Sequence, residues 1–582
     1  MSRITLLLLL FFAKITLSVG QGTPVAEGSN QYFLLDRFDI LSSGRTPFHT
    51  SLKPFSQSDA VIFAFEILKD SSLSEKNRED VFFLFDDNNE WIAAGETPLP
   101  LTAKAEKGKL ALDSENHPFY KKTEKPLFGI FYKTPANFFE LNKKDFYLRV
   151  NPVLNFFFAK DQNGAEPVFL NRRGLDIRAG VDDRIFIYTN IHENQARFAD
   201  YVNERIARDK AVPGAGLFKN YESDIFNISK GYDFLNAQAM IGFNVTRHVG
   251  VQFGHGRNFI GNGYRSLLLS DFANNYFYLK LNWRVWRFQL QNIFAELAAE
   301  PKPRSEDRLL SKKYMASHHL SYDITPNLNF GFFETVVFSR NNHFELQYLN
   351  PVIIYRTVEQ MVGSPDNVLI GLDAKWNFLR RFQAYGQLIL DEFLFKELFL
   401  ENRGWWANKY GVQAGLKYVN AFGLNNLDLQ AEWNSMRPYT YSHKDSSANY
   451  THYGQALAHP LGANFREGIF LLRYRPFKKW SVDFRYIAAR TGEDADSTNW
   501  GGNILLPNIT REQTYGNETG QGVGAKINLA AVNVSYRLFH NFFIDAQFFM
   551  RKKDSDDDAR DLTTQYFGIG LRLNSAPLKM DF

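Results

Sequence analysis

The sequence predicts an all-β protein: a transmembrane antiparallel β-barrel of about sixteen to eighteen strands, with eighteen as the best estimate, and a small N-terminal helical or mixed domain. Three observations predict this fold: an export signal, apolar and polar residues that alternate with a period of two, and a contrast between short turns and long loops. A soluble chain of 582 residues would be expected to divide into several domains of about 150 residues. A barrel escapes this expectation because it grows by adding strands.

Residues 1–20 have the features of a secretory signal peptide. A basic residue precedes the apolar run from Ile4 to Phe12, and the small residues from Ser18 to Gly20 predict cleavage after Gly20. No later run approaches the roughly 18 to 20 apolar residues that a spanning helix requires, which excludes a helical membrane protein. The chain has no cysteine, so we expect neither a disulfide framework nor a lipidated cysteine.

Residues 21–125 differ from everything that follows. Apolar residues recur close to helical spacing from Ala60 to Leu68 and from Asp80 to Phe85, with Ser, Asp and Asn at the breaks. The Pro- and Lys-rich sequence at 98–109 is typical of a connector. We therefore expect a small mixed domain with about two helices, which either plugs the barrel or lies beneath it in the periplasm.

Residues 126–582 form the predicted barrel, and strict alternation begins near Phe146. Residues 427–434, 480–486 and 532–538 alternate apolar and polar side chains, so each segment has one apolar and one polar face. A soluble β-sandwich would also alternate, but these strands approach the length of about 9 to 11 residues that crosses a bilayer, and aromatic residues crowd their ends. We expect one set of side chains to face the lumen (Asp428, Gln430, Glu432, Asn434) and the other to face lipid (Leu427, Leu429, Ala431, Trp433).

The connections are short in some places and long in others. Tight turns are expected at 286–287 and 380–381, and long loops at 193–221, 434–465 and 490–522. This asymmetry is typical of outer-membrane barrels. The last amphipathic strand, 565–573, and the aromatic Phe582 resemble the signal that the barrel-assembly machinery recognises. The sequence thus predicts a multi-pass barrel in the cell outer membrane, in contact with lipopolysaccharide.

The segment richest in glycine runs from Gly254 to Ser266. It lacks both the Lys-Ser/Thr pair of a phosphate loop and the glycine spacing of a dinucleotide fingerprint. Two interpretations stay open: a tight loop that folds into the lumen, or the same loop with two arginines that hold an anionic group. The candidate lumen residues are Arg257, Gly261, Gly263 and Arg265.

A second segment, from Arg437 to Asn464, combines tyrosine, histidine and arginine. Tyrosine rings can stack on sugars while polar groups bind hydroxyls, so we expect an outward carbohydrate-binding patch; an aromatic loop packed on the barrel mouth is the alternative. The histidine spacings match no regular ligand pattern, so no metal site is predicted. The candidate carbohydrate-binding residues are Arg437, Tyr439, Tyr441, His443, Tyr450, His452 and His459.

Other functional classes lack support in the sequence. The net charge of +4 is small and no basic stripe is present, so nucleic acid is not an expected partner. No Gly-x-Ser-x-Gly or His-Glu-x-x-His motif occurs, and Asp391 and Glu392 would point to opposite faces of a strand. We therefore predict no catalytic residues, no cofactor and no enzymatic activity.

Several motifs together resemble the Wzi-like capsule-assembly outer-membrane proteins of Bacteroidota, a group that includes RemB-like gliding-motility proteins. The resemblance covers nearly the whole mature chain and rests on five segments: 34–37 (Leu-Leu-Asp-Arg), 256–271, 349–351 (Leu-Asn-Pro), 405–410 (Trp-Trp-Ala-Asn-Lys-Tyr) and 437–464. It implies an eighteen-stranded barrel with an N-terminal helical portion, and a role in holding or assembling surface polysaccharide or in gliding. The helical look of residues 193–216 departs from a simple barrel.

Three functions follow as hypotheses. The first is a non-enzymatic protein for surface polysaccharide (capsule or exopolysaccharide) assembly or attachment. The second is a specific channel for sugars or other small solutes, which needs a continuous polar lumen. The third is an enzyme that modifies lipid or glycan, which needs a nucleophile and a base within hydrogen-bond reach.

Overall fold

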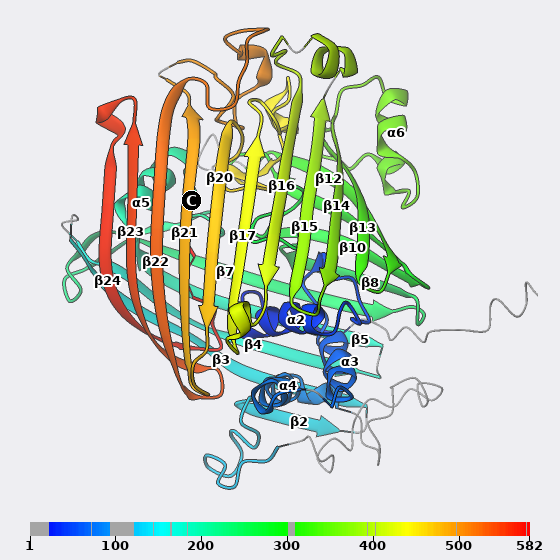
Figure 1. The fold of residues 1–582 in the computed structure, drawn as a ribbon, viewed down its shortest axis with the longest axis vertical. Helices are drawn as coiled ribbons and strands as arrows, with labels where there is room; N and C mark the ends of the chain where they lie inside the picture. Colours follow the sequence, from blue (N-terminus) through cyan, green and yellow to red (C-terminus); the bar gives the residue numbers. More distant parts are fainter. Residues whose placement is uncertain are drawn as a thin grey trace, which may run out of the picture.

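The alternating segments form a closed antiparallel barrel (Figure 1), which confirms the predicted fold class. The computed structural model describes residues 22–71, 73–92, 121–143, 145–162, 166–182, 184–300, 309–340, 342–392, 394–401, 403–495, 497–577 and 579–582. The expected signal peptide at 1–20 and the connector at 98–109 lie outside these residues.

Eighteen strands of the described chain make the wall, and the first, β3, closes the barrel by pairing with the last, β24. In chain order they are β3 (Phe146–Asp161), β4 (Val168–Val181), β5 (Ile185–Arg197), β7 (Ile228–Asn244), β8 (Val249–Gly256), β10 (Tyr276–Val285), β11 (Phe288–Ala298), β12 (Lys312–Thr325), β13 (Leu328–Phe338), β14 (Asn367–Phe378), β15 (Phe382–Glu392), β16 (Lys409–Tyr418), β17 (Leu427–Met436), β20 (Phe465–Tyr474), β21 (Trp480–Glu493), β22 (Val523–Phe539), β23 (Phe542–Ser555) and β24 (Leu562–Leu573).

Five α-helices and six short strands of the described residues lie outside the eighteen wall strands. The helices are α2 (Asn30–Leu41), α3 (Gln57–Leu68), α4 (Glu75–Asp87), α5 (Asp200–Asp209) and α6 (Tyr355–Met361). The short strands are β1 (Leu52–Lys53), paired with β9 (Phe259–Ile260), β18 (Thr451–His452), paired with β19 (Gln455–Ala456), β2 (Phe139–Lys143), paired with β3, and β6 (Lys219–Ser223), paired with β7. Within the described residues, no helix combines the length and apolarity needed to cross a membrane.

The two faces of each strand have the predicted chemistry. On β17, Asp428, Glu432 and Asn434 are buried inside the barrel, whereas Trp433 is 46% exposed on the outside. Because every peptide group in the hydrocarbon layer needs a partner, a closed barrel with an apolar outer surface is the form in which strands cross a bilayer. The predicted division of β17 into a lumen face and a lipid face is confirmed.

The N-terminal helices cover the end of the barrel that carries the short turns (Figure 1). Segments 60–68 and 80–85 lie in α3 and α4, as their spacing predicts, and α2 is a third helix that the spacing did not reveal. Ion pairs join this domain to the ends of the wall strands: Asp59 contacts Arg284 at 2.6 Å and Asp80 contacts Arg475 at 2.8 Å. On α2, Asp39 accepts from Lys375 of β14 at 2.8 Å, inside the barrel.

The chain after the last wall strand does not stay in the wall. β24 ends at Leu573, and residues 574–577 and 579–582 lie in the barrel interior, where Phe582 packs against Tyr201 of α5. Phe582 thus lies beyond β24 and inside the barrel, and its recognition by the barrel-assembly machinery stays a prediction. The Phe582 ring is buried. An aromatic side chain can pack in a protein interior as well as at a membrane interface.

Candidate functional site

The barrel interior is occupied by the lumen loop, which we define as residues 257–275 between β8 and β10. Wall side chains hold its backbone: the Glu432 carboxylate accepts from the backbone N–H of Tyr264 at 2.6 Å and of Arg265 at 3.1 Å. Gln387 accepts from the N–H of Leu267 at 2.8 Å. Leu267 and the two leucines after it are fully buried. The loop is thus folded inward and fixed to the wall.

Two of the candidate glycines permit this close approach. Gly261 has a φ of +137°, and a Cβ there would lie 2.3 Å from the Gln387 amide nitrogen. A Cβ on Gly263 would lie 2.6 Å from a Glu432 carboxylate oxygen. A side chain at either position would displace the groups that hold the loop.

Arg265 lies at the centre of a buried charge cluster. Its guanidinium contacts Glu467 at 3.3 Å and Asp581 at 3.2 Å, and Arg485 contacts Asp581 at 3.2 Å. His459 bonds to Glu467 at 2.8 Å. Although burial opposes ionisation, the two arginines hold the pKa of Asp581 well below its usual range. The cluster therefore ties the lumen loop to residues 579–582 rather than presenting an open fork to an external anion.

The Arg437 to Asn464 segment does not form an outward patch, so the expected exposure of its tyrosines is wrong. Tyr439, Tyr441 and Tyr450 are fully buried. The hydroxyl of Tyr441 donates to the carbonyl of Leu267 at 2.6 Å, and that of Tyr450 donates to the carbonyl of Leu268 at 2.8 Å. A tyrosine that could stack on a sugar can equally seal a buried loop, and composition alone does not distinguish the two roles.

The other candidate residues of this segment are enclosed as well. His443, His452 and His459 are buried, and burial lowers the pKa of each imidazole, that of His452 to about 3. Arg437 is half-buried and donates to the Asn408 carbonyl at 3.3 Å. Within the described ranges, no three His, Asp or Glu side chains are arranged to hold a metal ion. The segment is a hydrogen-bonded cover on the lumen loop.

A different set of aromatic and cationic side chains remains accessible at the long-loop end. The loop between β15 and β16 meets the 494–522 loop through a hydrogen bond from Trp406 N–H to the Thr514 carbonyl, 3.0 Å long. The Arg511 guanidinium lies 4.2 Å from the Trp406 ring centre, and the Arg403 guanidinium lies 4.3 Å from that of Tyr515. We call this set the rim surface: Arg403, Trp405, Trp406, Arg511 and Tyr515.

Sequence reasoning missed the rim surface as a site. In the sequence, Trp405-Trp406 stands out only as part of the family resemblance, and residues 511–515 lie about a hundred positions further along the chain. Stacked Trp–Arg and Tyr–Arg pairs present flat apolar faces beside hydrogen-bond donors, which is the chemistry that suits a sugar ring with an acidic substituent. Only the contact between the two loops reveals the combination.

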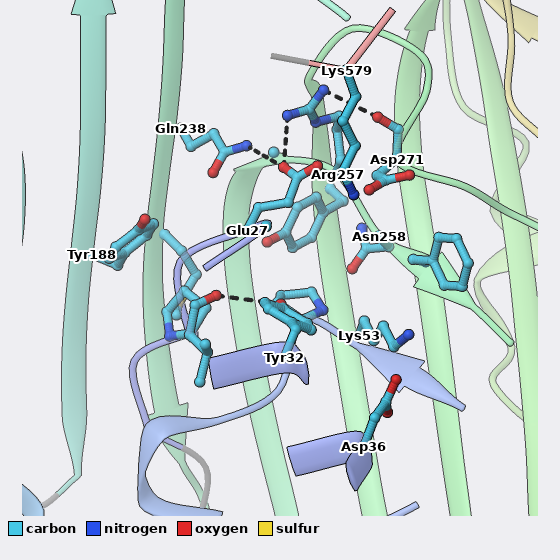
Figure 2. A pocket seen from close by; sticks show the side chains of 18 of the residues that line it. Glu27, Tyr32, Asp36, Lys53, Tyr188, Gln238, Arg257, Asn258, Asp271 and Lys579 are labelled. Atoms are coloured by element: carbon cyan, nitrogen blue, oxygen red, sulfur yellow. Dashed lines mark hydrogen bonds and ion pairs between the residues drawn. The ribbon is translucent and has the colours of Figure 1, made fainter. Parts of the chain in front are cut away.

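A cavity of about 230 Å³ with several charged side chains in its lining lies inside the barrel between α2 and the lumen loop (Figure 2). Glu27 accepts from Arg257 at 2.6 Å and from Gln238 at 3.2 Å, and Arg257 also donates to the Asp271 carbonyl at 3.0 Å. Candidate Arg257 is thus engaged by the protein's own groups. Lys53 lies across the cavity, 4.8 Å from the ring centre of Phe259.

Burial shifts the titration of the cavity groups. It raises the pKa of Glu27, although Arg257 opposes the shift, and it lowers the pKa of Lys53. Burial would also raise the pKa of Asp36, but Lys417, 3.1 Å away, and Lys53 outweigh it and lower that pKa. Because each of these basic groups already faces a carboxylate of the protein, the cavity does not present an unpaired cation to a bound anion.

The comparisons with known proteins identify a shared fold. No protein-family model and no curated protein sequence matches the chain. Among solved structures it is similar to Wzi of Escherichia coli, an outer-membrane carbohydrate-binding β-barrel involved in group 1 capsule assembly, with a TM-score of 0.53, 13% identity, and 95% of this chain and 99% of that chain covered. It is also similar to OprD of Pseudomonas aeruginosa (TM-score 0.41, 8% identity, 73% and 94% covered) and OccAB2 of Acinetobacter baumannii (0.40, 9%, 74% and 97%). At such identities the similarity to Wzi shows the fold, that of a multi-pass outer-membrane barrel.

Proposed function

We propose that this outer-membrane barrel is a non-enzymatic attachment or assembly protein for surface polysaccharide, and that it binds the polymer at its rim surface. The observation that carries the proposal is the filled interior: the lumen loop is fixed to the wall by Glu432 and Gln387 and sealed by Tyr441 and Tyr450. A barrel whose lumen is packed in this way suits a holding function better than passage of a solute.

The rim surface supplies the chemistry for the polymer. The exposed Tyr515 ring and the half-exposed tryptophans offer faces for sugar rings, and Arg511 can hold a uronate or pyruvate carboxylate in a two-pronged contact. Arg403 is already paired with Glu397 and Glu401 and contributes through its contact with the Tyr515 ring. Each exposed contact contributes about 1 kcal/mol or less, so retention requires several sites along one polymer. Wzi, with the same fold, is a carbohydrate-binding barrel, which supports a sugar ligand here. The gliding role implied by the family resemblance stays a prediction.

Binding to a defined acidic polymer tests the proposal. Purified barrel in detergent is passed over immobilised alginate, a polyuronate, with neutral dextran as the reference. We expect retention on alginate that is lost in the double variant Trp406→Ala, Arg511→Gln. The matched control is Trp433→Ala, which removes a tryptophan from the lipid face and leaves binding unchanged. Equal retention of all three proteins would contradict a rim site.

Conductance separates holding from transport. Intact protein in planar bilayers is expected to conduct little, because the lumen loop and the N-terminal helices occupy the barrel. Steady channels that appear only after deletion of residues 22–92 would support the alternative that the N-terminal helices are the plug. Large, steady channels from the intact protein would favour the transport function instead.

A further inference from the structure

One long connection lies against the outside of the barrel wall instead of over its mouth. We call residues 342–366, between β13 and β14, the outer strap; it contains α6, which Figure 1 shows beside the wall. Alternate residues of β13 show on which face of the wall the strap lies. Phe333 and Val337 belong to the interior core with the lumen loop. Val336 and Phe338, on the opposite face, pack with Tyr348 and Tyr355 of the strap. The strap therefore covers the lipid-facing surface.

Beneath the strap the wall carries three polar side chains on its outer face. Asn292, His318 and Glu334 are neighbours on β11, β12 and β13 by strand register, and all three are buried. Glu334 accepts from His318 at 3.0 Å and from the backbone N–H groups of Tyr355 at 2.8 Å and Arg356 at 2.9 Å. Asn292 donates to the Pro351 carbonyl at 2.8 Å. These side chains satisfy strap backbone groups that lipid could not satisfy.

The covered strip lies within the depth of the membrane. Phe330, which pairs with Tyr322, stands at the level of an aromatic girdle at the short-turn end, where Tyr322 stacks on Phe288. The apolar band of such barrels is about 25 Å tall and their strands tilt by about 40°, so about ten residues at roughly 3.3 Å each cross it. From Phe330 this distance reaches the end of β13. Val336 to Phe338 therefore lie in the half of the band nearest the long loops, and Glu334 lies close to the midplane.

The outward side of the strap alternates apolar and polar residues, and its charged side chains are paired within the protein. The exposed polar residues are Asn342, His343, Gln347, Asn350, Arg356, Thr357, Gln360 and Ser364. Arg356 pairs with Glu359 at 2.8 Å, and Arg340 at the strap's start pairs with Asp366 at 2.6 Å. The strap also exposes large apolar side chains, as the lipid-facing surface of the neighbouring wall does. They are Leu346, Leu349, Val352, Ile354 and Met361.

We propose that the outer strap is immersed in the outer leaflet of the membrane, with these side chains in contact with lipid acyl chains and the Asn292–His318–Glu334 group as its dock on the wall. The dock explains why a carboxylate occupies a lipid-facing position: the strap's own N–H groups compensate it. This interaction surface is independent of the rim surface and of the proposed polysaccharide ligand.

Cysteine labelling tests the proposal directly, since the chain has no cysteine. A Val352→Cys variant is refolded into phosphatidylcholine vesicles and treated with a water-soluble maleimide. Leu320→Cys, on the lipid face of β12 beside Leu290 and Phe332, is the control in lipid, and Lys444→Cys, in an exposed long loop, is the aqueous control. We expect labelling at position 352 about tenfold or more slower than at 444, because thiolate formation is suppressed in hydrocarbon.

A second measurement identifies what covers the strap. A bimane probe at position 352 should be quenched by phosphatidylcholine with brominated acyl chains. Rapid maleimide labelling, or protection without quenching, overturns the proposal; protection together with cross-linked dimers points to a second copy of the chain. Glu334→Ala should undock the strap and raise labelling at 352, whereas Glu334→Gln, which keeps an acceptor oxygen, should raise it less. A heat-modifiable gel shift verifies that each variant has folded.

Discussion

Replacement of Arg265 by glutamine should lower the free energy of unfolding more than loss of a single exposed ion pair does. The change removes the guanidinium that lies between Glu467 and Asp581, whose side chains are 0% and 7% exposed. Loss of one partner of a buried pair costs about 3–5 kcal/mol. Because Glu467 keeps His459 and Asp581 keeps Arg485, we expect the lower end, about 3 kcal/mol, which is roughly a hundredfold in the unfolding equilibrium.

Urea unfolding of the barrel in lipid vesicles, followed by tryptophan fluorescence and gel mobility, measures this loss. The matched control is Arg173→Gln, because Arg173 pairs with Glu193 at 3.2 Å with both side chains about half exposed, and such pairs contribute about 0–1 kcal/mol. A second change, Asp581→Asn, should restore part of the loss by removing the uncompensated charge. If Arg265→Gln and Arg173→Gln lower the free energy of unfolding equally, the cluster does not hold the interior together.

Three further outcomes are expected. The depressed pKa of Asp581 means that its contribution is fully present above the ordinary carboxyl pKa of about 4 and is lost as the pH falls below it; urea midpoints at pH 3 and pH 6 should differ more in the parent than in Asp581→Asn. Leu429→Arg should cost about 2–4 kcal/mol in vesicle unfolding if position 429 lies near the bilayer midplane, and a cost near zero would contradict its lipid-facing orientation. Tyr441→Phe should lower stability by about 1 kcal/mol, through loss of the bond to Leu267, and leave alginate retention unchanged; lost retention with normal stability would restore the sequence-based binding role.

The wall was predictable because strand alternation is a local property. Leu427 to Asn434 reveal both faces of β17 without knowledge of any other strand, since side chains alternate about the strand axis. The tight turns are local as well: Val285 pairs with Phe288 around 286–287, and Phe378 pairs with Phe382, so the turn predicted at 380–381 spans residues 379–381.

The interior was not predictable in the same way. Glu432 and Tyr264 are 168 positions apart, and nothing in either neighbourhood encodes their contact. The buried state of Tyr441 depends on a lumen loop that enters from elsewhere in the chain, so its composition suggested a surface site. The rim surface likewise combines Trp406 with Arg511, and local patterns carry no information on such a pair.

The return of residues 574–577 and 579–582 into the interior constrains how the molecule can assemble. This tail leaves β24 at the short-turn end and ends beside Arg265, while residue 576 lies against Gly28 of the N-terminal domain. The tail must enter through the end that the N-terminal helices cover, or be enclosed while the seam between β3 and β24 is still open. Closure of that seam and docking of the N-terminal helices are therefore the two steps after which this tail can no longer enter the interior.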